Sequence, residues 1–285
     1  MDKYMFYYVG GAFLLYISYV MVFKIIPKII RFFKASGRVV KNAKKLSKGL
    51  FSRVYLNDNS TLTNLEYKKI ALGALYSEQQ TAYINSLETG LKESEIRNLL
   101  SEWWRIYSSE EAYKSLEKIA NEGQRSYFDI VFKAYKITDV NERTNFIKTS
   151  FDINDERYQE HVQNVYSQLD NLRGTFSELK ENEIIRNDID LKRYNNIAWD
   201  CGRLVFLSRL CFDIKYISES EAWKYIDYAY ELAIENFYSW KDFSRSYIIG
   251  RSMWGGKGCA NIGIMEIAKE LLEHEKSPWV NLKLK

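Results

Sequence analysis

The feature that most constrains the fold of this chain is a helix expected over residues 195–212 that is apolar on nearly all of its sides. Its apolar residues recur at the spacing of one helical face, and Trp199, Phe206 and Leu210 add a second apolar stripe. A helix with so little polar surface is stable only where other elements cover it. We therefore expect it at the centre of a domain.

Charged residues nevertheless lie on this central helix, at Asp200, Arg203 and Arg209. A buried charge must be paired and hydrogen-bonded, because an unpaired one is strongly destabilising. Asp200 and Arg203 are three positions apart, which lets them pair on one helical face. Two interpretations stay open: a structural ion pair that locks helix packing, or a ligand-binding or catalytic pair in a cleft.

Capping residues predict two further helices, over about residues 219–237 and 240–253. Ser218 with Glu221 fits the capping box, in which the hydroxyl and the carboxylate each accept from the other residue's backbone amide. Ser239 begins a weaker version of the same motif. These caps set the starts of the two helices.

Arg251 stands out on the second of these helices because apolar packing does not explain it. It shares a helical stripe with Trp254 and other aromatic residues, and a planar, weakly hydrated guanidinium can lie against such rings. One interpretation is an aromatic core that contains an arginine. The other is a candidate ligand or ion-pair site in which Asp200 and Arg203 face Arg251 and Trp254, with Arg125 added from the other half of the domain.

Several spaced motifs resemble the bacterial domain-of-unknown-function family 1266. They are WDCGR, YISESEAW, SWKDFSRSYIIGRSMWGG and the terminal SPW, with ALGAL and SEWWRIYSSEEAYKSLEKIANEGQRSYF upstream. The resemblance covers about residues 68–279, with a poorly matched stretch over 130–193. It implies a largely helical bacterial domain with no established activity. It also implies a histidine where this chain has Gln124, so an acid/base group is lost here if that position takes part in chemistry.

Composition predicts an all-α fold. Hydrophobic residues make up 46 % of the 285 residues, and two prolines with fourteen glycines suit long helices better than a β fold with many turns. The three cysteines are odd in number and lie in helical patterns, so we expect buried thiols in a reducing compartment: Cys201, Cys211 and Cys259. With only two histidines and no CxxC motif, we expect no metal site and no cofactor.

Residues 4–23 form an uncharged run, YMFYYVGGAFLLYISYVMVF. As a helix, a run of about 20 residues spans the roughly 30 Å of a bilayer core. A signal peptide is the competing interpretation, but the positive charge follows the apolar run and no small-residue cleavage site is present. We therefore expect residues 1–23 to be a retained transmembrane anchor.

Residues 24–56 are expected to form a basic amphipathic juxtamembrane helix and a linker. Nine Lys or Arg and no acidic residue lie between positions 24 and 48. The segment is either a plain stop-transfer sequence or a helix lying on anionic headgroups. Eight of the basic residues recur every three or four positions and are the expected membrane-surface contacts: Lys24, Lys28, Arg31, Lys34, Arg38, Lys41, Lys45 and Lys48.

This basic flank also predicts the orientation. By the positive-inside rule the flank and the domain behind it are cytoplasmic, so the protein is a single-pass protein of the bacterial inner membrane with its N-terminus outside. The expected partners are therefore the bilayer, its anionic headgroups and a protein. Subtracting the nine flank charges from the formal net charge of +4 leaves −5, which disfavours nucleic-acid binding.

Residues 57–285 are expected to form the helical domain, with halves over about 65–130 and 194–279. The polar stretch between the halves predicts helices joined by exposed loops, with a hinge near residues 173–175. His161 lies there among polar neighbours, and we expect it to be solvated. Whether the two halves fold together is not fixed by the sequence.

The segment GRSMWGGKG, residues 250–258, has a superficial likeness to a phosphate-binding loop. The spacing is wrong, because Gly256 stands where that motif needs lysine, and the segment follows a helix instead of a strand. We expect a glycine-rich helix end in which Gly255 or Gly256 takes a positive φ. Lys257 could still hold an anion beside Arg251.

Three functional hypotheses follow. The leading one is a membrane-anchored, cytoplasm-facing protein-interaction or regulatory module, because the domain is rich in aromatic residues and poor in catalytic ones. The alternative is an enzyme of unknown reaction that uses the Asp/Arg cleft. The third is a lipid sensor in which the basic flank is the functional part.

Overall fold

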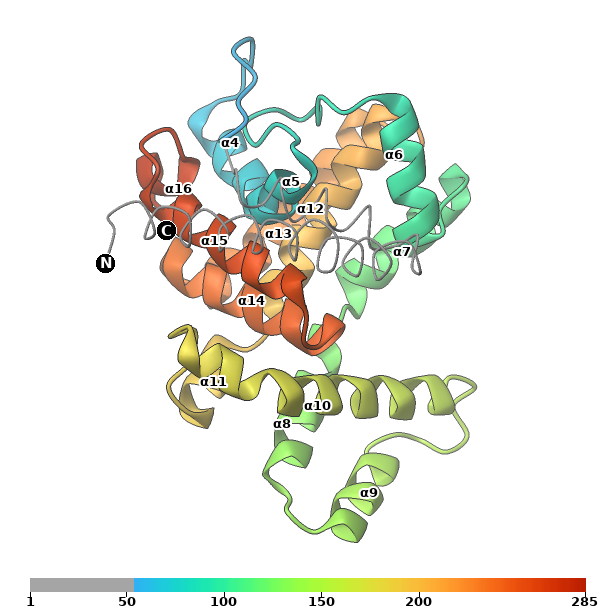
Figure 1. The fold of residues 1–285 in the computed structure, drawn as a ribbon. Coiled ribbons are helices and arrows are strands. Elements are labelled where there is room, and N and C mark those ends of the chain that lie inside the picture. The colour runs from blue at the N-terminus through green and yellow to red at the C-terminus, as the bar shows by residue number, and fades with distance from the viewer. Residues whose placement is uncertain (1–53) are drawn as a thin grey trace, which may run out of the picture. The chain divides into compact units, whose positions relative to one another are not determined.

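All regular structure in the described part of the chain is helical, and no strand is found there (Figure 1). The structure is a computed structural model that describes residues 54–285, except for the side chains of residues 259–262. The all-α class is confirmed for this part. The helices are α4 (Asn64–Ile70), η2 (Ala71–Gly73), α5 (Ala74–Gln80), α6 (Glu93–Leu99), η3 (Leu100–Trp104), α7 (Ser109–Asn121), η4 (Arg125–Tyr127), α8 (Phe128–Lys136), α9 (Val140–Thr149), α10 (Tyr158–Glu181), α11 (Asp188–Tyr194), α12 (Ile197–Asp213), α13 (Glu219–Asn236), α14 (Trp240–Gly255), α15 (Cys259–Glu273) and α16 (Pro278–Asn281).

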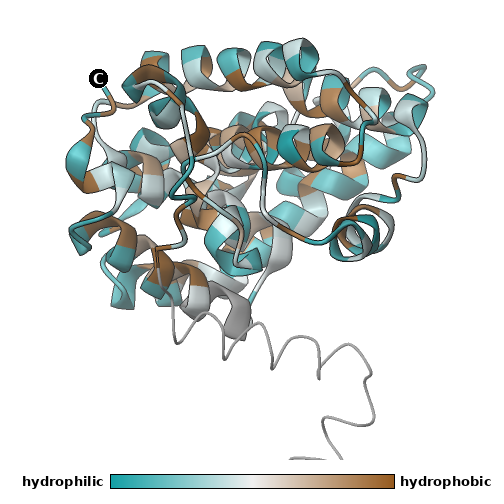
Figure 2. Ribbon diagram, turned by 90° about the horizontal axis from the view of Figure 1, so that it is seen from above, coloured by the Kyte–Doolittle hydropathy of each residue, from teal (hydrophilic) through white to brown (hydrophobic). Residues whose placement is uncertain are grey.

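The expected central helix is α12. Every residue from Ala198 to Cys211 is buried, and the helix packs against α13, α14, α7, α5 and η2. The surrounding helices are amphipathic: in Figure 2 hydrophobic and hydrophilic residues alternate along each of them. Burial of α12 on all sides explains why its sequence has no continuous polar face.

Gly202 allows the closest approach of other elements to α12. A Cβ atom at this position would lie 2.6 Å from Cε2 of Tyr247 and 3.1 Å from the carbonyl oxygen of Leu72. Both distances are shorter than carbon and oxygen atoms tolerate without displacement. The glycine therefore seats the Tyr247 ring of α14 directly on the backbone of α12.

The predicted caps of α13 and α14 are confirmed. The Ser218 hydroxyl accepts from the Glu221 amide at 3.3 Å, and the Glu221 carboxylate accepts from the Ser218 amide at 2.8 Å. At the start of α14 the Ser239 hydroxyl accepts from the Asp242 amide at 3.1 Å. These bonds satisfy backbone donors that a helix start leaves without partners.

The hinge expected near residues 173–175 is wrong. α10 runs without interruption from Tyr158 to Glu181, and it lies between α14 on one side and α8 on the other (Figure 1). Buried residues lie on one side of the helix both before and after Gly174, at Leu172, Thr175 and Leu179. Packing on both neighbours thus outweighs the weak helix propensity of one glycine.

The expectation that His161 is solvated is also wrong. Its side chain is 17 % exposed, its ring stacks on Phe151 at a centroid distance of 5.2 Å, and its Nδ1 lies 2.8 Å from the Tyr127 hydroxyl. Its Nε2 lies 3.6 Å from Oδ2 of Asp155, and Asn164 donates to the same Tyr127 hydroxyl at 3.3 Å. This histidine is part of the packing between α10 and the start of α8.

The cysteines whose side chains the structure describes, Cys201 and Cys211, are buried free thiols. Burial raises the pKa of Cys211 to about 12, and it also raises that of Cys201. Thiols of this kind stay protonated and unreactive at neutral pH. They pack as small apolar groups, as the sequence predicted for these two positions.

Within residues 54–285, no helix has both the length and the apolar character that crossing a bilayer requires. The expected anchor at residues 4–23 and the basic flank at 24–48 lie outside the described residues. Residues 54–285 belong to one compact unit. The structural findings below concern this unit alone.

Candidate functional site

Asp200 is the centre of an ion-pair cluster and is only 1 % exposed. Its Oδ1 pairs with Nη2 of Arg203 one helical turn away. Its Oδ2 accepts from the backbone amide of Arg125 at 2.8 Å and lies 3.3 Å from Nη1 of the same residue. Both carboxylate oxygens are therefore engaged by cations, which is the structural ion-pair arrangement considered from the sequence.

Arg125 also closes the C-terminal end of α7. Its guanidinium donates to the carbonyl of Ile119 at 2.7 Å and to that of Ala120. Gly123 makes this turn possible: its φ is +60°, and a Cβ there would lie 2.2 Å from Oδ2 of Asp200. This left-handed glycine and the predicted buried carboxylate thus belong to one joint between α7 and α12.

Arg251 does not join the ion pair but lies against the aromatic residues next to it. Its guanidinium carbon is 5.1 Å from the ring centroid of Trp254 and 6.0 Å from that of Trp199. The guanidinium carbon of Arg203 is 5.1 Å from the same Trp199 ring. The structure therefore brings four of the five expected residues around Trp199, and Arg125 reaches them only through Asp200.

Two tyrosines complete this group of side chains. The Tyr247 ring meets Trp199 edge-on at 5.1 Å, and the Tyr76 ring of α5 lies 6.3 Å from Trp199. We call Tyr76, Trp199, Arg203, Tyr247 and Arg251 the arginine–aromatic junction. It is built from α5, α12 and α14, and Trp104 of η3 borders it at 5.9 Å from the Arg203 guanidinium.

Four buried donor atoms of the junction have no hydrogen-bond partner within the described residues. They are Nε1 of Trp199, Nε of Arg203, the hydroxyl of Tyr247 and Nη1 of Arg251. A buried polar group without a partner is destabilising by about 1–3 kcal/mol, and native structures contain few of them. Four such atoms in one place mark the junction as a site that is not optimised for folding.

Arg209 shows what a structural arginine looks like in the same helix. It is completely buried, and all of its nitrogens donate. The acceptors are the carbonyls of Leu87, Tyr83 and Glu88 and the hydroxyl of Ser77, at distances of 2.6–3.1 Å. Burial lowers the pKa of Arg209 to about 10. Full hydrogen bonding satisfies this buried cation, whereas Arg251 receives no comparable set of partners among the described residues.

The electrostatics of the junction follow from burial. Burial raises the pKa of Tyr76 and of Tyr247, and the nearby guanidiniums of Arg203 and Arg251 oppose that rise. Burial also lowers the pKa of Arg251. The phenols are therefore neutral donors at physiological pH, and the positive charge of the two arginines is not neutralised by them.

The glycine-rich end of α14 serves Arg251. A Cβ at Gly255 would lie 1.7 Å from Nη1 of Arg251, so any other residue at this position would displace the guanidinium from where it lies here. Gly256 has a φ of +65° and ends the helix as predicted. Lys257 is exposed and forms no described contact with Arg251.

Sequence reasoning missed Tyr76, Trp104 and the role of Trp199. Tyr76 lies on α5, far from α12 in the sequence, within an ordinary apolar stripe. The neighbouring Trp103 and Trp104 face different surroundings, because Trp103 is 47 % exposed while Trp104 packs against Tyr76 at 6.4 Å. Nothing in the local pattern distinguishes Tyr76 from a core tyrosine.

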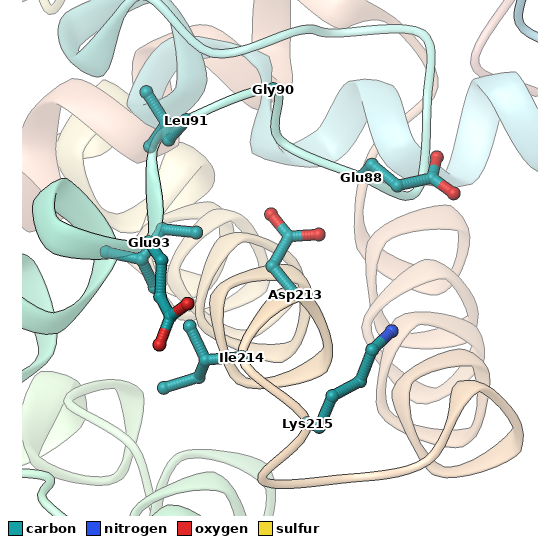
Figure 3. Close-up of a pocket in the computed structure, with 8 residues that line it drawn as sticks. Glu88, Gly90, Leu91, Glu93, Asp213, Ile214 and Lys215 are labelled. Atoms are coloured by element: carbon teal, nitrogen blue, oxygen red, sulfur yellow. The ribbon is translucent and has the colours of Figure 1, made fainter.

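A separate pocket of about 450 Å³ lies at the C-terminal end of α12 and contains none of the expected site residues. Figure 3 shows the Asp213 side chain between the segment with Glu93 and the loop with Glu88. Asp213 accepts from the Thr89 amide at 3.0 Å and from the Thr89 hydroxyl, and burial raises its pKa. These bonds hold the loop in place, so we assign Asp213 a structural role. The pocket is lined by Glu88, Gly90, Leu91, Glu93, Ile96, Asp213, Ile214 and Lys215.

Comparison with protein families decides the classification. The model of the family described as "Protein of unknown function (DUF1266)" matches residues 99–284.

The chain belongs to this family.

The DUF1266 match includes Trp199, Arg203, Tyr247 and Arg251, whereas Tyr76 lies before its first residue. The resemblance noted upstream of position 99 is thus outside the matched residues. No curated protein and no solved structure shows a significant match. The description of the family names no activity.

Gln124, where the resemblance implies histidine, has a packing role in this DUF1266 chain. Its side-chain oxygen accepts from Gln168 at 2.8 Å, and its backbone carbonyl accepts from Asn196 at 3.2 Å. Gln124 therefore ties α10 to the start of α12.

The described residues contain no group of three or more His, Cys, Asp or Glu that could hold a metal ion.

Proposed function

We propose that this protein is a membrane-tethered regulatory module whose helical domain binds a small ligand at the arginine–aromatic junction. One observation carries the proposal: four buried donors of the junction, on Trp199 and on side chains next to it, have no hydrogen-bond partners among the described residues. A ligand that accepts from them supplies the missing bonds. Binding then stabilises the contact of α14 with α5 and α12. A protein partner can distinguish the ligand-bound domain from the free domain by this contact.

The enzyme alternative has less support. Asp200, the carboxylate of the expected Asp/Arg pair, has both oxygens engaged by Arg203 and Arg125, and it is buried behind them. General acid–base catalysis needs a group that can exchange a proton near neutral pH. The junction offers guanidiniums, an indole and phenols with a raised pKa, which suit binding better than proton transfer.

The membrane tether rests on the sequence. The uncharged run at residues 4–23 followed by a flank with nine basic residues favours a single-pass protein of the bacterial inner membrane, with the domain in the cytoplasm. We expect the full chain to stay with the membrane after alkaline carbonate extraction. A variant without residues 1–23 should move to the soluble fraction, and equal fractionation of the two proteins would refute the tether.

Ligand binding is tested by comparing Arg209, which is completely buried, with Arg251, whose Nη1 atom is buried. Arg251→Met keeps an unbranched apolar side chain in place of the arginine stem while removing donors that lack partners, so we expect the free energy of unfolding to stay within about 1 kcal/mol of wild type. Arg209→Met leaves several buried acceptors without donors, and we expect a loss of about 3 kcal/mol or more. The measurement is urea unfolding of the full chain.

The contrast between the two variants is the control. If Arg251→Met destabilises the protein as much as Arg209→Met does, the Arg251 donors are needed for folding and the proposed ligand site is wrong. If Arg251→Met leaves the stability unchanged, the arginine is kept for something other than the fold.

A further inference from the structure

We infer that the ligand of the arginine–aromatic junction presents an oxyanion, a phosphate or a carboxylate group, to Arg251 and Arg203. This inference rests on the proposed function and names the ligand class. Its first support is chemical type. Nε1 of Trp199, Nε of Arg203 and Nη1 of Arg251 can only donate, and the Tyr247 hydroxyl can donate as well. Only a group rich in acceptors satisfies all four.

The second support is charge. Arg125, Arg203 and Arg251 bring three positive charges to this part of the fold, and Asp200 neutralises one of them. Within the described residues no carboxylate forms an ion pair with Arg251, although its Nη1 is buried. A buried cation without a counter-charge is strongly unfavourable. A bound anion provides the counter-charge that this region lacks.

The third support is geometry. A guanidinium is planar and presents paired N–H groups that match the two oxygens of a carboxylate or phosphate. Gly255 leaves room for Arg251 to lie flat along α14, since a Cβ there would be 1.7 Å from Nη1. Trp254 covers the guanidinium at 5.1 Å and is itself 42 % exposed. The arginine is thus held in one orientation close to solvent, where an anion can reach it.

Unfolding of the full chain in inorganic phosphate, acetate and chloride at matched ionic strength tests the inference. For a ligand that binds only the folded state, the folding equilibrium constant grows up to tenfold for each tenfold rise in ligand above its dissociation constant. We expect this dependence for wild type in phosphate or in acetate, and the more effective anion identifies the ligand as phosphoryl or carboxylate. We expect none in chloride.

Arg251→Met should remove the dependence, and Tyr247→Phe should weaken it. Arg173→Met, which removes one exposed positive charge from α10, is the matched control and should respond like wild type. Equal responses of wild type and Arg251→Met would overturn the inference, because phosphate also stabilises proteins non-specifically. So would a wild-type protein that does not respond to either oxyanion. In either of these two cases the ligand is not an anion. If Arg251→Met is also as stable as wild type without added anions, the proposed ligand site stands and its ligand is a neutral acceptor.

Discussion

At the scale of single residues, the buried arginines of this chain fall into two kinds. Arg209 donates from every nitrogen to groups of its own chain, whereas Nε of Arg203 and Nη1 of Arg251 are buried without acceptors among the described residues. The first arrangement stabilises the native state. The second leaves donors available for another molecule, which is why the proposed site is placed there.

The ion pairs of Asp200 also stabilise the native state, and replacing this residue should show it. In Asp200→Asn the buried guanidinium of Arg203 and that of Arg125 lose their counter-charge, so we expect unfolding to become easier by about 3–5 kcal/mol. The measurement is urea unfolding of the full chain.

The matched control for Asp200→Asn is Asp129→Asn. Asp129 pairs with Lys192, but it is 69 % exposed, and surface pairs contribute about 0–1 kcal/mol. Equal losses of unfolding free energy for the two substitutions would mean that Asp200 does not hold α7 and α12 together.

At the scale of elements, the sequence predicts what local patterns determine. The apolar character of α12 on all sides predicts its central position, and the Ser218 and Ser239 caps fix where α13 and α14 begin. α10 could not be predicted as one helix, because contacts with α14 and α8 carry it past Gly174. Such contacts join residues far apart in the sequence, and no local pattern records them.

The candidate site was predictable to a similar extent. Asp200, Arg203 and Arg251 could be singled out because charges on apolar helices need an explanation. Their division into an ion pair and a ligand site depends on Trp199, Tyr76 and hydrogen-bond partners on other helices. An aromatic residue in an apolar stripe has the same local pattern whether it borders a site or fills a core.

At the scale of the whole molecule, the described unit is a member of the DUF1266 family in which the matched residues 99–284 contain most of the junction. α5, which carries Tyr76, completes the junction from outside that match. The proposed ligand site is therefore shared between the family region and the segment that precedes it. A membrane tether before this segment would hold the site close to a bilayer.

The central claim is that the junction keeps its donors for a ligand and not for folding, and the Tyr247 hydroxyl tests it most directly because one atom is removed. The measurement is the change in the free energy of unfolding of the full chain for Tyr247→Phe. Tyr225→Phe is the matched control, since the hydroxyl of this buried tyrosine donates to Glu117 at 2.7 Å and its loss should cost about 1.5–3 kcal/mol. We predict that Tyr247→Phe is as stable as wild type or more stable by up to about 1 kcal/mol. A loss as large as that of Tyr225→Phe would contradict the claim.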